Sequence, residues 1–260
     1  MRDLPQVGLD PVQIGQVVHA HGLHLVFARE RAHRRPARDK ERFLPTLLDQ
    51  IRAVDLTRFD LDREIIVVDD CSRDGTAEVA RRVPGTIVRR QEPNQGKGAA
   101  VRAGLAVATG EFVMIQDADL EYDPNDYVPM LEALLSGGAD VVYGNRYHRG
   151  LWRSKHSRQS WGAYLGGRSL SLVALACTGR YLADTVTALK LFRRDLVLSL
   201  QVRGSGFELD HEISAKALAR GCRIVEVPIG YSPRTKAEGK KIGARDWIRA
   251  ARTFFRYRNG

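Results

Sequence analysis

Two carboxylates one residue apart follow a short apolar run near the middle of the chain. Residues 112–115 are apolar, and Gln116, Asp117 and Asp119 follow at the end of that run. The run predicts a buried strand of a parallel sheet, and ligand sites in such sheets lie beyond the carboxyl ends of the strands. Two hard oxygen donors there can hold Mg²⁺ or Mn²⁺, and the metal can hold a diphosphate. Because Asp is also common in turns, the pair alone does not decide between these two interpretations.

Acidic residues also end an earlier apolar run. Residues 64–68 lead directly into Asp69 and Asp70, and Ser72 and Asp74 follow. A carboxylate at this place can accept hydrogen bonds from a nucleobase or a ribose. A turn with a helix cap explains the same residues, and both can hold: Asp70 for a ligand and Asp74 for the cap.

A glycine-rich segment with one lysine follows the next expected strand. Residues 93–98 include Gly96, Lys97 and Gly98 and open an expected helix. A helix N-terminus with a lysine can bind an anion, although the spacing is not that of a P-loop. Close packing of the helix on the sheet explains the glycines equally well.

Alternating helical and strand patterns must position these residues. Helices are expected at 43–54, 74–82, 98–108 and 124–135, and strands at 64–68, 86–90, 111–116 and 139–143. This alternation predicts an α/β fold with a right-handed, doubly wound, mostly parallel sheet. Further on, helices are expected at 161–176, 207–220 and 245–258, strands at 189–192 and 223–229, and a basic loop at 147–156.

Composition limits the class of protein without choosing a partner. The chain has 260 residues, 43% of them apolar, which suits one large domain and excludes disorder of the whole chain. The net charge of +10 is compatible with nucleic acid, an anionic membrane face or phosphorylated substrates. Three cysteines without metal-site spacing, no spanning segment and no secretory signal predict a cytoplasmic protein.

The order of the motifs resembles the family 2 glycosyltransferases, and more narrowly the dolichyl- or polyprenyl-phosphate sugar transferases. The matching segments cover about residues 41 to 258 and occur in the family's order. They are residues 69–76, 94–99, 116–124, 143–146, 184–190, 206–213, 226–231 and 238–242 with Arg234.

This resemblance implies a GT-A fold and an enzyme that moves a hexose, with inversion, from GDP-mannose or UDP-glucose to a polyprenyl or dolichyl phosphate. It implies Mg²⁺ or Mn²⁺ on Asp117, Asp119 and Glu121. Carried over by position, the donor site comprises Asp69, Asp70, Lys97, Asp117, Ala118, Arg234 and Lys240. The reacting groups would be Asp119, Arg146 and Asp210.

The chemistry agrees with a phosphate acceptor. Such an acceptor is already anionic at neutral pH, so positioning and charge neutralisation matter more than a strong base. Arginines such as Arg146 suit bidentate phosphate contacts. A soluble hydroxyl acceptor remains the alternative, and Asp210 would then be the candidate base. Glu208, Asp210 and Glu212 cannot share one helical face, so at most two of them face the site.

The N-terminal segment departs from the family pattern. Relatives begin with an apolar strand that ends in an acidic motif and cradles the base. Here residues 23–27 could form a strand, but its ending and its distance from residue 41 are wrong. We therefore expect a divergent, poorly ordered segment at residues 1–40 and the glycosyltransferase domain at residues 41–260. An inactive relative with an impaired donor site is a further alternative.

The C-terminal helix could replace a membrane anchor. Trp247, Ile248, Phe254 and Phe255 fall on one face among many arginines. Such a helix can lie on an anionic bilayer, or it can pack on its own sheet with a solvated basic face. The expected partners are a nucleotide sugar, a lipid phosphate, and a peripheral contact at the cytoplasmic membrane face or a separate membrane subunit. Nucleic acid is not expected, because no nucleic-acid motif is present.

Overall fold

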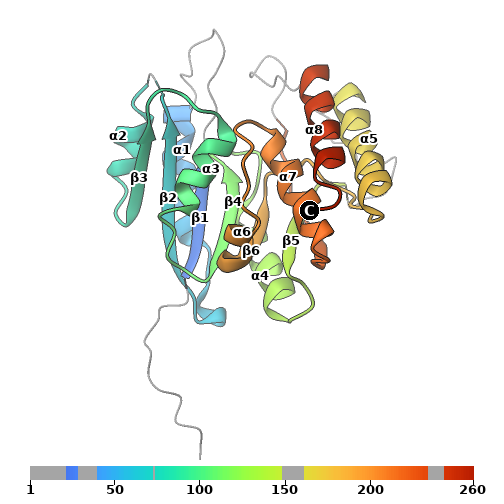
Figure 1. The fold of residues 1–260 in the computed structure, drawn as a ribbon. Helices are drawn as coiled ribbons and strands as arrows, with labels where there is room; N and C mark the ends of the chain where they lie inside the picture. Colours follow the sequence, from blue (N-terminus) through green and yellow to red (C-terminus); the bar gives the residue numbers. More distant parts are fainter. Residues whose placement is uncertain (1–21, 29–39, 73, 148–160, 234–242) are drawn as a thin grey trace, which may run out of the picture.

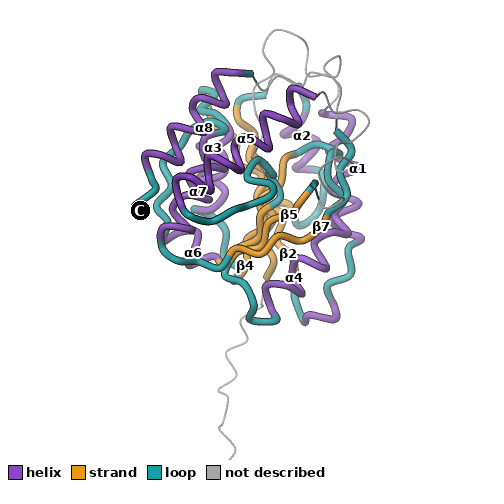
Figure 2. Tube along the Cα trace, turned by 90° about the vertical axis from the view of Figure 1, so that its right-hand side faces the viewer, coloured by secondary structure: helices purple, strands orange, loops and turns teal. Residues whose placement is uncertain are grey.

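The computed structural model of the protein describes residues 22–28, 40–72, 74–147, 161–233 and 243–260. A single seven-stranded sheet forms the centre, and helices cover both of its faces (Figures 1 and 2). The strands are β1 Gly22–Ala28, β2 Asp62–Asp70, β3 Thr86–Gln91, β4 Phe112–Asp117, β5 Val141–Asn145, β6 Lys190–Arg193 and β7 Ile224–Pro228. The helices are α1 Lys40–Ala53, α2 Thr76–Arg81, α3 Lys97–Leu105, α4 Tyr127–Leu135, α5 Trp161–Thr178, α6 Arg194–Ser199, α7 Glu208–Ala219 and α8 Ala244–Arg256. Two short 3₁₀ turns are η1 Thr57–Phe59 and η2 Pro124–Asp126.

The strand order is β3-β2-β1-β4-β6-β5-β7. Strand β6 pairs antiparallel with β4 and β5, and every other pairing in the sheet is parallel. The expected mostly parallel α/β sheet is thereby confirmed. Since parallel strands end at the same edge, the carboxyl ends of β2, β4 and β5 bring distant parts of the chain together.

Two apolar clusters hold the helices on the sheet. One joins α1 and α4 to one face through residues such as Leu47, Met114 and Leu131. The other joins α3, α6 and α7 to the opposite face through Val101, Val113 and Ile213. The strands β2 and β4 carry buried residues toward both clusters, which explains why residues 65–68 and 112–115 are apolar without interruption.

The first strand lies in the middle of the sheet. Strand β1 pairs with β2 on one side and with β4 on the other, with Val26 opposite Ile66 and Ile115. The boundary that the sequence suggested at residue 40 therefore falls within the sheet domain, between its first strand and α1. The sequence did not predict this central strand, because residues 23–27 lack the family's acidic ending. Pairing within a sheet uses backbone hydrogen bonds, which do not require that ending.

The C-terminal helix divides its apolar residues between two environments. Phe254 of α8 is fully buried and packs near Ala174 of α5, and the Trp247 indole Nε1 donates to Ser169 Oγ at 2.9 Å. Ile248 and Phe255 are exposed. The helix as a whole thus packs on the fold, and only part of the face predicted from its sequence is free. None of the helices in the described ranges has the length and apolarity to cross a bilayer.

Candidate functional site

The expected site residues gather at the carboxyl edge of the sheet. Asp69 and Asp70 end β2, Asp117 ends β4, and Arg146 directly follows β5. Helices α3 and α7 add Lys97 and Asp210 from the covering layer. Residues separated by more than 100 positions in the sequence therefore meet at one end of the fold.

Four charged side chains form a cluster where β4, α3, α7 and β6 meet. The Lys97 ammonium Nζ lies 3.0 Å from Asp117 Oδ1 and 3.0 Å from Asp210 Oδ2. The Lys190 ammonium lies 3.1 Å from the other oxygen of Asp210. Lys97, Lys190 and Asp210 are buried, whereas the Asp117 side chain is 30% exposed. We call Lys97, Asp117, Lys190 and Asp210 the lysine cluster.

Mutual neutralisation fixes the charges in the lysine cluster. Burial alone would raise the pKa of Asp210, but Lys190 and Lys97 outweigh it and hold that pKa below its ordinary value. Burial would lower the pKa of Lys97, and Asp117 and Asp210 together raise it instead. Asp210 is therefore ionised and engaged through both oxygens, which makes it a weak proton acceptor.

Close backbone packing places Lys97 in this cluster. A Cβ on Gly98 would lie 2.2 Å from the Gly204 carbonyl oxygen, and one on Gly96 would lie 2.4 Å from that of Ser205. The Gly98 amide donates to the Ser205 carbonyl at 2.8 Å. The glycines thus serve packing against the loop before α7, and that loop takes the first donors of α3. Lys97 contacts carboxylates here, so the helix start is not an open anion site.

The three acidic residues of α7 divide their roles. Glu208 accepts from the amides of Ser205 and Gly206, and Glu212 accepts from those of Arg203 and Gly204. These bonds hold the loop before the helix. Only Asp210 reaches the lysine cluster, in agreement with the expectation that at most two would face the site.

The expected metal ligands are only partly gathered. Asp119 is buried, and its Oδ1 accepts the Glu121 amide at 3.2 Å. The Glu121 carboxylate accepts from the Tyr231 hydroxyl at 2.8 Å, and Ala118 is buried beside Asp117. Within the described residues, no group of three or more His, Cys, Asp or Glu side chains is arranged to hold a metal. Asp117 and Asp119 nevertheless supply the hard oxygen atoms that Mg²⁺ or Mn²⁺ prefers, with a diphosphate able to supply more.

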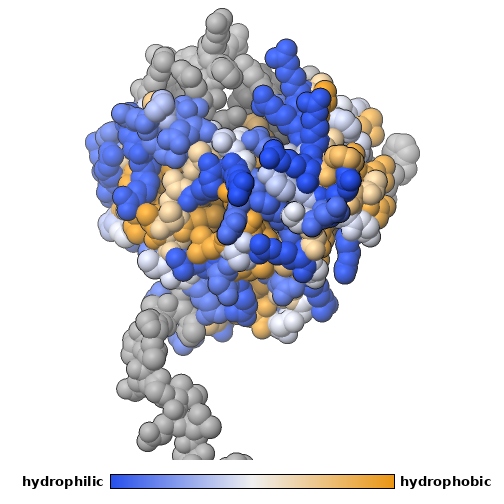
Figure 3. All heavy atoms as spheres, in the orientation of Figure 1, coloured by the Kyte–Doolittle hydropathy of each residue, from blue (hydrophilic) through white to orange (hydrophobic). Residues whose placement is uncertain are grey.

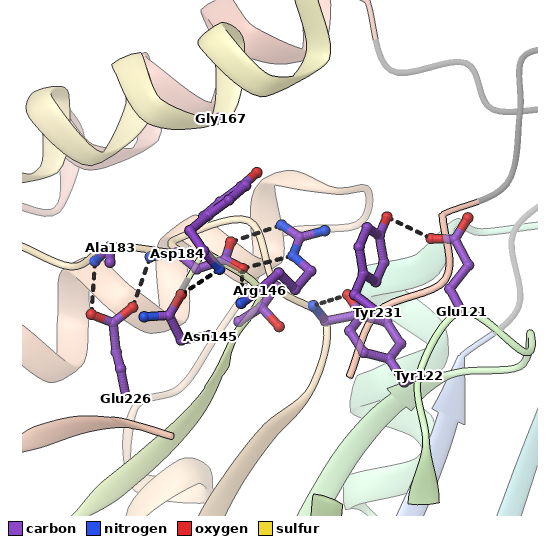
Figure 4. A network of polar contacts seen from close by, with 12 residues as sticks. Glu121, Tyr122, Asn145, Arg146, Gly167, Ala183, Asp184, Glu226 and Tyr231 are labelled. Atoms are coloured by element: carbon purple, nitrogen blue, oxygen red, sulfur yellow. Dashed lines mark hydrogen bonds and ion pairs between the residues drawn. The ribbon is translucent and has the colours of Figure 1, made fainter. Parts of the chain in front are cut away.

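A bidentate ion pair with Asp184 holds Arg146. Its Nε and Nη2 donate to the two oxygens of Asp184 at 2.6 and 2.7 Å, and both side chains are buried (Figure 4). Glu226 of β7 in turn accepts the amides of Ala183 and Asp184, each at 2.7 Å. Burial lowers the stability of the charged arginine, but Asp184 outweighs it and raises the pKa of Arg146. We call Arg146, Asp184 and Glu226 the arginine clamp.

Aromatic rings enclose the arginine clamp on one side. The Arg146 guanidinium lies 4.8 Å from the centre of the Tyr231 ring, and that ring lies 5.5 Å from the Tyr122 ring. The Tyr122 hydroxyl accepts the Ala188 amide at 3.1 Å. In Figure 4, Tyr231 lies between Arg146 and Glu121, so it links the clamp to the segment that follows Asp119.

The acidic end of β2 holds the neighbouring loop. The Asp70 carboxylate accepts from the Asn94 side chain at 2.6 Å and from the amides of Gln95 and Gly96, each at 2.7 Å. Asp69 accepts from the Ser72 amide at 3.1 Å. Asp74 accepts from the Thr76 hydroxyl at 2.6 Å, but the N-cap of α2 is Gly75, so the expected cap by Asp74 is wrong. Asp70 thus contacts the segment leading to Lys97, so its contacts here position a loop.

Sequence reasoning assigned no role to Asp184, Lys190, Glu226 or Tyr231. A charged residue in the short strand β7 was a signal for Glu226, because the rest of that strand is mainly apolar. Nothing local marks Lys190, whose partner is twenty residues away. Arg234 and Lys240 lie outside the described residues.

Comparisons with known proteins add a family and a fold. The sequence model of the family described as glycosyl transferase family 2 matches residues 36–198. An uncharacterized glycosyltransferase of Mycobacterium tuberculosis is 35% identical over 213 residues, which cover 80% of this chain and 88% of that protein. The dolichol-phosphate mannosyltransferase of Pyrococcus furiosus is 31% identical over 70% of this chain and 52% of that protein.

Among solved structures, glucosyl-3-phosphoglycerate synthase of M. tuberculosis is similar in fold. It was crystallised with Mn²⁺, UDP-glucose and phosphoglyceric acid, and it matches with a TM-score of 0.64 and 19% identity. The alignment covers 92% of this chain and 79% of that chain. This likeness confirms the expected GT-A type of fold.

Proposed function

Since the chain belongs to the family 2 glycosyltransferases, we propose that it transfers a hexose from a nucleotide sugar to a polyprenyl or dolichyl phosphate, with inversion. The observation that carries the choice of acceptor is the state of Asp210. Both of its oxygens are engaged by lysines and its pKa is lowered. A hydroxyl acceptor needs a base to take its proton, whereas a phosphate acceptor arrives ionised.

The neighbouring carboxylates support the same choice. Asp184 is engaged by Arg146, Glu121 by Tyr231, and Asp70 by three donors of the loop before α3. Each of these carboxylates is already in contact with a donor of the protein, so none of them is positioned as an obvious base for a hydroxyl acceptor. The similarity to a dolichol-phosphate mannosyltransferase agrees with a lipid phosphate, since that protein's name states such an acceptor.

We assign Asp117 and Asp119 to a divalent metal, with Lys97 as the group that neutralises Asp117 until the donor binds. A bound Mg²⁺ or Mn²⁺ would offset the negative charge of the leaving nucleoside diphosphate. Arg146 would contact a phosphate, and Asp184 would hold its guanidinium in position. Asp210 would keep Lys97 and Lys190 charged and in place, which makes it a positioning residue.

A donor and acceptor screen tests the function. We expect turnover of GDP-mannose or UDP-glucose with a short polyprenyl phosphate and Mn²⁺, and a loss of about a hundredfold or more in Asp119→Asn. Asp49→Asn is the matched control, because Asp49 is an exposed carboxylate of α1. Turnover with free sugars or 3-phosphoglycerate but without polyprenyl phosphate would overturn the acceptor assignment. Absence of binding and turnover with every nucleotide sugar would favour an inactive relative.

A further inference from the structure

Exposed apolar side chains are concentrated on the outer side of α5 and α8. Ten large apolar residues of the described chain are exposed, and six of them lie on these two helices. We define the α5–α8 face by five of them. They are Trp161, Leu165, Leu172, Ile248 and Phe255, which are 54%, 59%, 61%, 44% and 63% exposed. Isolated exposed apolar residues are ordinary, but such a concentration indicates a surface that contacts something.

Helical spacing lines these residues up. Leu165 and Leu172 lie four and eleven positions after Trp161, and Phe255 lies seven positions after Ile248, so each set follows one helical stripe. The helices run side by side in Figures 1 and 2. Trp247 contacts Ser169, and Phe254, seven residues later in α8, packs near Ala174, which is also later in α5. The two helices therefore run in the same direction. The two exposed stripes therefore extend along one surface.

A row of arginines borders the apolar stripe on α8. Arg245, Arg249, Arg252 and Arg256 are exposed and fall on adjoining turns of the same side of the helix. Within the described chain, none of these four forms an ion pair with a carboxylate. Helix α5 contains no acidic residue, and the one in α8, Asp246, accepts the amide of Gly243 at its own N-terminus. Figure 3 shows hydrophilic side chains over α8 beside apolar ones over α5.

We propose that the α5–α8 face binds the surface of a lipid bilayer that contains anionic lipids. Apolar side chains next to exposed arginines that form no ion pair within the described chain match the acyl boundary and the negative headgroups of such a leaflet. A second copy of the same face is a worse fit, because a two-fold contact would bring two arginine rows together. Membrane binding is inferred from the surface itself. Only the reason for that binding rests on the proposed function, since a lipid-phosphate acceptor is held in a bilayer.

Vesicle sedimentation with the full chain tests this inference. We expect binding to vesicles of phosphatidylcholine with phosphatidylglycerol, and weak binding to phosphatidylcholine alone. Leu172→Asp combined with Phe255→Asp should weaken binding about tenfold or more, because both charges would enter the acyl boundary. The matched control is Leu198→Asp, since Leu198 is an exposed leucine of α6, outside the face. Arg249→Glu combined with Arg252→Glu should remove the preference for anionic vesicles.

Three results would overturn the inference. These are no binding to anionic vesicles, equal loss in the Leu198 control, or a dimer in light scattering that the Leu172 and Phe255 changes dissolve. Thermal unfolding of each variant confirms that the fold is intact. Transfer to a short, water-soluble polyprenyl phosphate without vesicles should be unchanged in the face variants. Failure of the natural chain in that assay would count against the proposed function and not against the membrane surface.

Discussion

The lysine cluster and the arginine clamp both bury charge at the carboxyl edge of the sheet, but they share it differently. In the cluster, Asp210 forms ion pairs with both Lys97 and Lys190, and Lys97 forms ion pairs with both Asp210 and Asp117. In the clamp, Asp184 gives both oxygens to Arg146. A shared ion can release one partner and keep the other, so the cluster can accept incoming charge. The bidentate pair in the clamp holds its arginine in a single orientation.

The largest effect is expected where two cations depend on one carboxylate. Asp210→Asn leaves Lys190 without its ionic partner in a buried place, and we expect about 4 kcal/mol loss in the free energy of unfolding. Urea denaturation measures this. Adding Lys190→Met should restore part of the loss, because it removes the buried charge. A loss below about 1 kcal/mol would mean that the cluster does not share charge as described.

The clamp should respond with a smaller loss of stability and a change in activity. Asp184→Asn keeps one acceptor for Arg146 but removes the ionic partner, so we expect about 3 kcal/mol of destabilisation by urea denaturation. Arg146→Lys is the companion variant, since lysine keeps the charge but cannot make the bidentate pair. If Arg146→Lys transfers sugar as fast as the natural chain at equal acceptor concentration, orientation of the guanidinium is not the purpose of the clamp.

Proton uptake by His211 provides a third comparison, because this residue follows Asp210 in α7. Burial lowers the pKa of His211 to about 4, from about 6.5 in the unfolded chain. Between these values the unfolded chain binds more protons, so stability falls as the pH falls from 6.5 toward 4, by roughly 2 kcal/mol. His211→Leu should flatten this slope in urea denaturation series.

The opposing contribution of Asp126 is present in both chains, so their difference isolates His211. Burial raises the pKa of Asp126 to about 6, which makes the native state take up protons in part of the same range. An unchanged slope in His211→Leu would show that another group carries the pH dependence.

The smallest effect is expected where Tyr231 joins the arginine clamp to the segment that follows Asp119. Tyr231→Phe removes the hydroxyl that donates to Glu121, and we expect a loss of about 1 kcal/mol in the free energy of unfolding. The ring remains against Arg146, so the clamp should persist. A loss comparable to that of Asp184→Asn would show that Tyr231 supports the clamp through its hydroxyl.

Much of the fold could be predicted because local pattern and burial agree. The apolar runs of β2 and β4 are buried on both sides, and the expected bounds of α7 and β7 differ from the observed ones by one residue at each end. Helix α6 was not expected, since a six-residue helix gives little periodic signal. Strand β1 was not predicted as part of the sheet, because its sequence lacks the family's motif. Its pairing with β2 and β4 uses backbone groups, which leave no such signal.

The site could be predicted in its residue types but not in its contacts. Asp117 and Lys97 were expected at the donor site and Asp210 among the reacting groups, and Lys97 contacts both carboxylates. Lys190 pairs with Asp210, and Asp184 pairs with Arg146. Both pairs depend on the way β6 inserts antiparallel between β4 and β5. Such three-dimensional pairings leave no spacing in the sequence.

The central position of β1 has a consequence for synthesis on the ribosome. Its neighbour β2 follows soon after it, but its other neighbour, β4, begins at Phe112, roughly 80 residues beyond the end of β1. At ordinary elongation rates this interval lasts on the order of ten seconds. During that time the nascent chain carries one unpaired strand edge that only later sequence can cover, and such edges are where growing chains associate wrongly.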